Sequence, residues 1–129
     1  MSSYYYPVDV RLNTTPTAAD NISVCFHERM QVVAVKIVDH DGITADTTNY
    51  AVFQVLGSDK ATALYSWSTL NSAQGALTAN TSADMVAQGA EDKAIFEAGE
   101  VLIVKVTKNS SGKSTNASVC LQMRQARSY

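Results

Sequence analysis

The sequence predicts an all-β fold, a single antiparallel β-sandwich that is jelly-roll-like and has about eight strands. Short segments rich in β-branched residues alternate apolar and polar positions, which is typical of half-buried strands. Clusters of Asn, Asp, Gly, Ser and Thr separate these segments at intervals of roughly 8 to 20 residues, and no helical pattern is long enough to connect parallel strands. The 129 residues match the usual size of one domain, so we expect no second domain.

Five strands are expected in the first half of the chain. Val8, Val10 and Leu12 alternate with polar residues, which predicts the first strand, and Pro16 follows it in a segment rich in turn residues. A short polar segment at 57–60 indicates a hairpin between the last two strands. The five expected strands cover residues 8–12, 22–26, 31–38, 50–56 and 61–68.

The third of these strands has the most unusual pattern. Residues 32–38 are apolar at every position except Lys36, so apolar side chains face both sides. This predicts either a central strand covered on each side or a strand that lies in a subunit contact. The connection that follows, residues 39–49, is rich in Asp, Thr and Asn, as expected for a corner between two strands.

Three further strands are expected in the second half. In residues 100–108 and 118–124, apolar side chains recur at every second position, and a polar loop joins the two segments. Residues 83–89 fit either a short strand or one helical turn, and we favour the strand. A jelly roll is favoured over an immunoglobulin-like sandwich because the Cys-Trp-Cys spacing is absent. The expected layout is an N-terminal aromatic arm at 1–7, the sandwich at 8–124 and a C-terminal tail at 125–129.

Charge and composition restrict the expected partners. The formal net charge is −2 and the ten Lys and Arg residues are scattered, which argues against a nucleic-acid partner. No segment approaches the ~20 apolar residues of a membrane span, and the first residues lack the pattern of a secretory leader, so no membrane partner is expected. Charged residues make up only 17%, which indicates a surface partly covered in an assembly.

Cys25 and Cys120 lie within expected strands. Each is either a small buried residue or half of a disulfide that ties the terminal strands together. Two free thiols are favoured because no secretory leader is expected.

One loop resembles part of a phosphate-binding motif. Residues 111–115 match the end of a phosphate-binding loop, but Thr107 stands where the motif needs glycine. The motif also requires a helix after the loop, and an antiparallel strand is expected there. We therefore favour an ordinary hairpin in which Gly112 adopts a positive φ.

A second loop contains residue types that bind metals. Asp39, His40, Asp41 and Asp46 would suit a calcium or transition-metal site, yet Asp and Gly are also standard turn residues, so a turn is favoured. The chain has two histidines and no Gly-x-Ser-x-Gly nucleophile motif. A carboxylate pair brought together by the fold stays open as a minor alternative. We expect no enzyme activity, and thus no catalytic residue, metal site, cofactor or small-molecule substrate.

An aromatic run precedes the first alternating strand. Tyr4, Tyr5 and Tyr6 are followed by Pro7, and three adjacent aromatic residues cannot all reach one core face. The run is either an end held loosely against the domain or an arm that docks on a partner.

Residues 32–38, 43–51 and 98–107 resemble the paired-strand, corner and glycine-led strand pattern of β-sandwich proteins from tailed-bacteriophage virions, specifically head-decoration (cement) proteins. The resemblance implies a non-enzymatic protein that binds the major capsid protein on the capsid surface, after assembly in the host cytoplasm. It also implies a homo-oligomer, with a trimer as the expected form, which stabilises the shell. We expect the contact region at Tyr4–Pro7, and next at the 39–49 connection with Asp46 and Asn49.

An alternative assignment is a phage tail or fibre module that binds a carbohydrate or receptor. Trp67, Tyr65 and Tyr50 would then form an exposed platform on which a sugar stacks. Tyr65 and Trp67 alternate within one expected strand, however, so a place in the core or in an interface is favoured for both.

Overall fold

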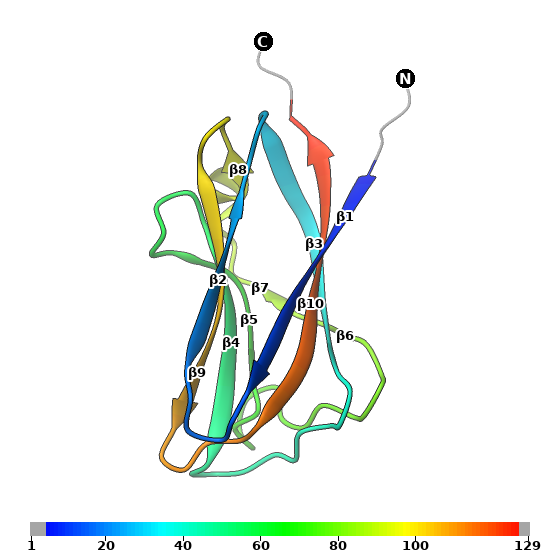
Figure 1. The fold of residues 1–129 in the computed structure, drawn as a ribbon, viewed down its shortest axis with the longest axis vertical. Coiled ribbons are helices and arrows are strands. Elements are labelled where there is room, and N and C mark those ends of the chain that lie inside the picture. Colours follow the sequence, from blue (N-terminus) through cyan, green and yellow to red (C-terminus); the bar gives the residue numbers. More distant parts are fainter. Residues whose placement is uncertain (1–4, 127–129) are drawn as a thin grey trace.

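The computed structural model describes residues 5–126, which form two antiparallel sheets packed face to face (Figure 1). In spatial order, the β1 sheet contains β1 (Tyr5–Thr14), β10 (Thr115–Gln125), β3 (Met30–Asp39) and β6 (Ala83–Asp84), with β8 (Ile95–Phe96) also paired to β3. The β2 sheet contains β2 (Asp20–Cys25), β9 (Val101–Asn109), β4 (Tyr50–Leu56), β5 (Ala63–Ser68) and β7 (Val86–Ala87). The predicted all-β sandwich is confirmed.

The strand order is that of interleaved Greek keys. The late strand β10 lies between the early strands β1 and β3, and β9 likewise lies between β2 and β4. Early and late segments therefore pair across almost the whole chain, from Tyr5 opposite Arg124 to Thr14 opposite Thr115. This connectivity supports the jelly-roll-like assignment.

The long apolar run of β3 has a local explanation. Val32 faces the core near the start of the strand, whereas Val35 and Ile37 face it further along, so the inward positions change from even to odd numbers. The change occurs at a bulge, where Val33 has no partner between Val32 opposite Met123 and Ala34 opposite Gln122. β3 lies inside its sheet, as predicted. The side chains on its outer face are only half-buried, so a subunit contact that covers this face stays a prediction.

The 83–89 segment and the chain start differ from expectation. Residues 83–89 form two short strands, β6 and β7, which belong to different sheets and flank the buried Met85. The short 3₁₀ helix η1 (Glu91–Ala94) and β8 were not expected. β1 begins at Tyr5, three residues before the expected Val8, because an edge strand tolerates Pro7, which lacks an amide proton.

Both cysteines are free thiols, as favoured from the sequence. Cys25 lies on the outer face of the β2 sheet and Cys120 on the outer face of the β1 sheet, so the core separates them. Burial and the neighbouring Asp9 raise the pKa of the Cys120 thiol, which keeps it protonated. Within residues 5–126, no helix is long and apolar enough to cross a membrane.

Candidate functional site

The predicted contact residues lie at opposite ends of the sandwich (Figure 1). Tyr5, Tyr6 and Pro7 begin β1 at the end where the N-terminus lies, and Tyr4 is outside the described residues. Asp46 and Asn49 lie in the connection between β3 and β4, beside the β9–β10 hairpin. Because β1 has ten residues, the two ends are about 30 Å apart. The structure therefore does not bring the predicted residues together in one site.

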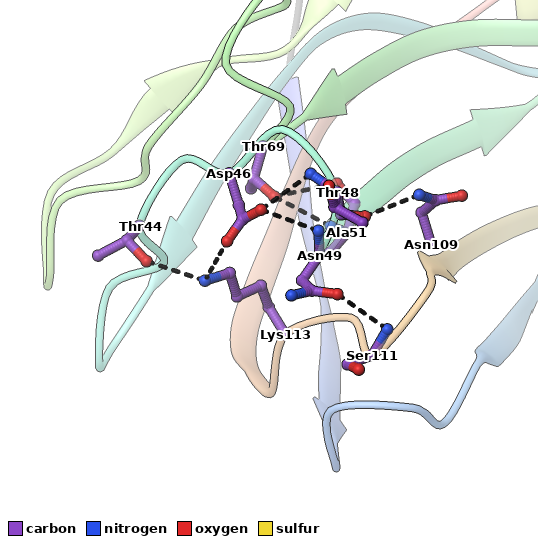
Figure 2. A network of polar contacts seen from close by, with 9 residues as sticks. All are labelled: Thr44, Asp46, Thr48, Asn49, Ala51, Thr69, Asn109, Ser111 and Lys113. Atoms are coloured by element: carbon purple, nitrogen blue, oxygen red, sulfur yellow. Dashed lines mark hydrogen bonds and ion pairs between the residues drawn. The ribbon is translucent and has the colours of Figure 1, made fainter.

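Asp46 organises a turn at the end of the β3–β4 connection (Figure 2). One of its carboxylate oxygens accepts hydrogen bonds from the amides of Thr48 at 2.8 Å and Asn49 at 3.0 Å. Its other oxygen lies 3.5 Å from the Lys113 ammonium nitrogen. These amides, and then Lys113, hold the pKa of Asp46 below its ordinary value. The carboxylate is thus occupied by contacts within the chain.

Asn49 joins the same connection to the hairpin between β9 and β10. Its side-chain oxygen accepts a hydrogen bond from the Ser111 amide at 3.0 Å, and the Asn109 side chain donates to the Thr48 carbonyl at 2.7 Å (Figure 2). Lys113 also donates to the Thr44 hydroxyl at 3.1 Å. We call this set of contacts, from Thr44 to Asn49 and from Asn109 to Lys113, the polar corner. The polar corner holds together two loops that are far apart in the sequence. That it also contacts a partner stays a prediction.

The candidate metal-binding residues are engaged in turn contacts. Asp39 is 1% exposed, and its two oxygens accept hydrogen bonds from the amides of Asp41 at 3.0 Å and Asn116 at 2.9 Å. The Arg11 guanidinium donates to His40 Nε2 at 3.0 Å. Because Arg11 can only donate, Nε2 is the acceptor in this contact, and His40 Nδ1 lies 3.1 Å from the Asn80 side-chain oxygen. Among residues 5–126, no three His, Cys, Asp or Glu side chains are grouped as a metal site requires.

The phosphate-loop resemblance falls on a hairpin, as predicted. Gly112 adopts φ +64° in the turn between β9 and β10, and no helix follows it. A Cβ atom at this position would lie 2.1 Å from the Pro16 carbonyl oxygen and 2.9 Å from Lys108 Cβ. Glycine is therefore required here by both the backbone conformation and the close approach of the β1–β2 loop.

Lys108 was not singled out from the sequence, although its position is informative. Leu102, Val104 and Val106 face the core, and the same alternation places a lysine at the next inward position. Its ammonium donates to the Thr14 hydroxyl at 2.8 Å and to the Thr15 and Ala18 carbonyls, each at 2.9 Å. Burial lowers the pKa of this lysine. In the sequence, the signal for this contact is a lysine at a position of β9 where the alternation predicts a core-facing apolar residue. Lys108 anchors the β1–β2 loop through these hydrogen bonds.

The aromatic residues divide into packed and exposed groups. Tyr65 and Trp67 pack against the core beside Val55 and Phe53, and the Trp67 indole donates to the Gly75 carbonyl at 3.2 Å. Tyr50 lies on the opposite face of β4, so the three side chains do not form one platform.

Tyr5 and Tyr6 are exposed by 51% and 43%. Among the described residues, these two are the exposed large aromatic side chains. We call the start of β1, with Tyr5 and Tyr6, the tyrosine end.

No family model and no curated protein matches this chain. Among solved structures, a chain from Desmodium yellow mottle tymovirus is 10% identical with a TM-score of 0.45, and the match covers 98% of this chain and 84% of that one. A chain from the structure of infectious bursal disease virus, Gt strain, is 12% identical with a TM-score of 0.31, covering 97% of this chain and 31% of that one. At these scores and identities, neither neighbour assigns this chain to a family.

Proposed function

We propose that this protein is a non-enzymatic structural component of a virion that binds the surface of an assembled phage capsid as a homo-oligomer, a trimer in its expected form, and stabilises the shell. Its partners are the major capsid protein and further copies of itself. The observation that carries this proposal is the exposure of Tyr5 and Tyr6, by 51% and 43%, at the start of an edge strand. The resemblance of the strand and corner segments to phage decoration proteins supports the choice of shell.

Exposed tyrosines suit a protein interface. A tyrosine side chain buries a large apolar area at a small cost in conformational entropy, and tyrosine is enriched among residues that contribute most to binding. Removing apolar surface from water stabilises a contact by about 25 cal/mol per Å². The tyrosine end therefore offers more binding free energy than a polar surface whose groups already bond within the chain.

Tyr5 and Tyr6 project to opposite sides of β1, because successive residues of a strand alternate. Tyr6 lies opposite Met123 in the same series as the buried Val10, so it is on the core side. Tyr5 lies opposite Arg124 in the outward series. Tyr5 is thus the described residue that we assign to the shell contact, on the outer face of the β1 sheet.

An oligomer would strengthen such a contact. Several copies of Tyr5 in one assembly bind a repetitive shell with an effective concentration that a single copy lacks. Closed symmetry would also cover exposed sheet edges, here those of β1 and β2.

The test is binding of purified Tyr5→Ser protein to phage shells that lack the native protein. We expect at least a roughly tenfold loss of affinity, because hot-spot tyrosines contribute about 2 kcal/mol or more. Val86→Ser is the control, since Val86 is 40% exposed on the other sheet. Equal binding of Tyr5→Ser and wild type would remove Tyr5 from the contact, and no binding of wild type to any shell would disprove the function.

A further inference from the structure

We propose that two copies of this protein pair through their β1 strands, which lie antiparallel about a two-fold axis at Val10 and join the two β1 sheets into one. The inference rests on the proposed function only in taking the protein to be a homo-oligomer, and it names one contact of that oligomer. A two-fold contact joins copies in pairs, so we expect an even number of copies, either a dimer or two trimers joined together.

The strand β1 has a free edge. Among the strands within residues 5–126, β10 alone pairs with β1. In an antiparallel pair, hydrogen-bonded residues alternate with residues that make no bond across the pair, so every second residue of β1 directs its amide and carbonyl away from β10. A row of unpaired main-chain groups binds another extended strand, which makes a β-strand the occupant of this edge.

Two observations identify the residues that face the free edge. The His40 amide donates to the Asn116 carbonyl at 2.9 Å, so Asn116 and every second residue after it in β10 face β3. The residues opposite them in β1, which include Asp9 and Arg11, therefore face away from β10. Pro7 belongs to the same series, where its missing amide proton costs no bond to β10.

The charges of β1 select one register for a second copy. With Val10 on the two-fold axis, Asp9 of each copy lies opposite Arg11 of the other copy. Since both residues face the free edge, each exchanges two main-chain hydrogen bonds with its counterpart. An axis at Asp9 or at Arg11 would place that residue opposite the same residue of the second copy, and like charges directly opposite each other destabilise a sheet. The strand is therefore complementary to itself about Val10.

The charges of Arg11 and Asp9 are not neutralised within the described chain. Arg11 Nη1 donates to His40 Nε2 at 3.0 Å, and Nη2 donates to the Asn116 side-chain oxygen at 2.6 Å. These contacts use two of the five N–H groups of a guanidinium, and neither partner is a carboxylate. Asp9 lies beside the Cys120 thiol, and no ion pair within residues 5–126 includes Asp9 or Arg11. Both charges therefore favour the pairing between copies.

The core-facing side of β1 fits the same register. Val8, which is half-buried, lies opposite Leu12 of the second copy and gains an apolar neighbour there. Tyr6, which is 43% exposed, lies opposite Thr14 of the second copy, and a cross-strand pair of an aromatic and a β-branched residue stabilises a sheet. Tyr5 points to the outer face instead, so it remains available to the shell.

Charge reversal tests the register. Asp9→Arg places two cations on the edge and Arg11→Asp places two anions there, so like charges meet when either variant pairs with itself. We expect each variant alone to sediment at half the mass of the wild type. An equimolar mixture should recover the wild-type mass, because each cation of one variant then lies opposite an anion of the other.

Asp92→Arg is the matched control for Asp9→Arg, since it makes the same change of charge. Asp92 is exposed in η1, beside β3 and β5 on the side of the sandwich away from β1. This variant should keep the wild-type mass.

A proline tests the main-chain bonds separately from the charges at the edge. Asp9→Pro removes an amide that faces the free edge, so β1 keeps its hydrogen bonds to β10 and circular dichroism should show a folded protein. We expect this variant also to sediment at half the wild-type mass, and it decides the question if Arg11→Asp does not fold.

The outcomes separate this inference from the proposed function. A wild type with an odd number of copies, a folded Asp9→Arg or Asp9→Pro protein that keeps the wild-type mass, or a mixture of folded charge variants that stays at half this mass would each overturn the inference. Shell binding by a trimeric wild type would leave the proposed function standing. Conversely, copies that pair as expected but bind no shell would disprove the function and leave the β1 contact intact.

Discussion

The polar corner and the tyrosine end occupy opposite ends of one sandwich and differ in where their interactions lie. At the polar corner, Asp46 and Asn49 bond to backbone amides and to the β9–β10 hairpin, so their polar atoms serve the fold. At the tyrosine end, Tyr5 and Tyr6 keep about half of their surface exposed. The comparison teaches that residue type alone does not identify a binding site. Changes at the polar corner should act on stability, and changes at the tyrosine end on association.

The largest expected effect is at the polar corner. Gly112→Ala combines a positive φ with a Cβ atom 2.1 Å from the Pro16 carbonyl oxygen, so unfolding free energy should fall by about 3 kcal/mol or more. Urea denaturation measures this loss.

Gly99→Ala provides the matched control. Gly99 has φ +88° in the turn before β9, and no atom lies within 4 Å of its added Cβ. The unfolding free energy of Gly99→Ala should fall by only about 1–2 kcal/mol, which is the cost of a left-handed backbone conformation for a residue with a Cβ atom. Equal losses at the two glycines would show that the contact between the hairpin and the β1–β2 loop adds no constraint.

Much of the fold was predictable because alternation reports which side chains face the core. Strands such as β4 and β9 were predicted on this basis. The β3 bulge and the sheet change at Met85 were not predicted, since both depend on how distant strands pair. The polar corner has the same limit: Asn49 contacts Ser111, 62 residues away, and no local pattern indicates such a contact. The exposure of Tyr5 follows more directly, because three adjacent aromatic residues cannot share one face.

A smaller effect is expected from Asp46, and it should depend on pH. The backbone amides of Thr48 and Asn49, and then Lys113, hold the pKa of Asp46 below its ordinary 3.8. A carboxyl group with a lower pKa in the folded state stabilises the fold above its ordinary pKa, and this contribution is lost as pH falls through the folded value.

Asp46→Asn should therefore be less stable than wild type near neutral pH, by less than Gly112→Ala, and the difference should shrink below about pH 4. Urea denaturation of both proteins across this range measures it. A difference that stays constant with pH would mean that the Asp46 charge does not contribute to the polar corner.

The smallest effect on stability is expected at the tyrosine end, where we expect the greatest effect on association. Replacing both Tyr5 and Tyr6 by serine should change the unfolding free energy by no more than about 1 kcal/mol, because both side chains are roughly half exposed on an edge strand. The same urea experiment that detects the Gly112→Ala loss measures this value. A loss as large as that of Gly112→Ala would show that the tyrosines stabilise the fold as the polar corner does. A small loss, together with failure to associate, would show that the exposed tyrosine surface serves contacts between molecules.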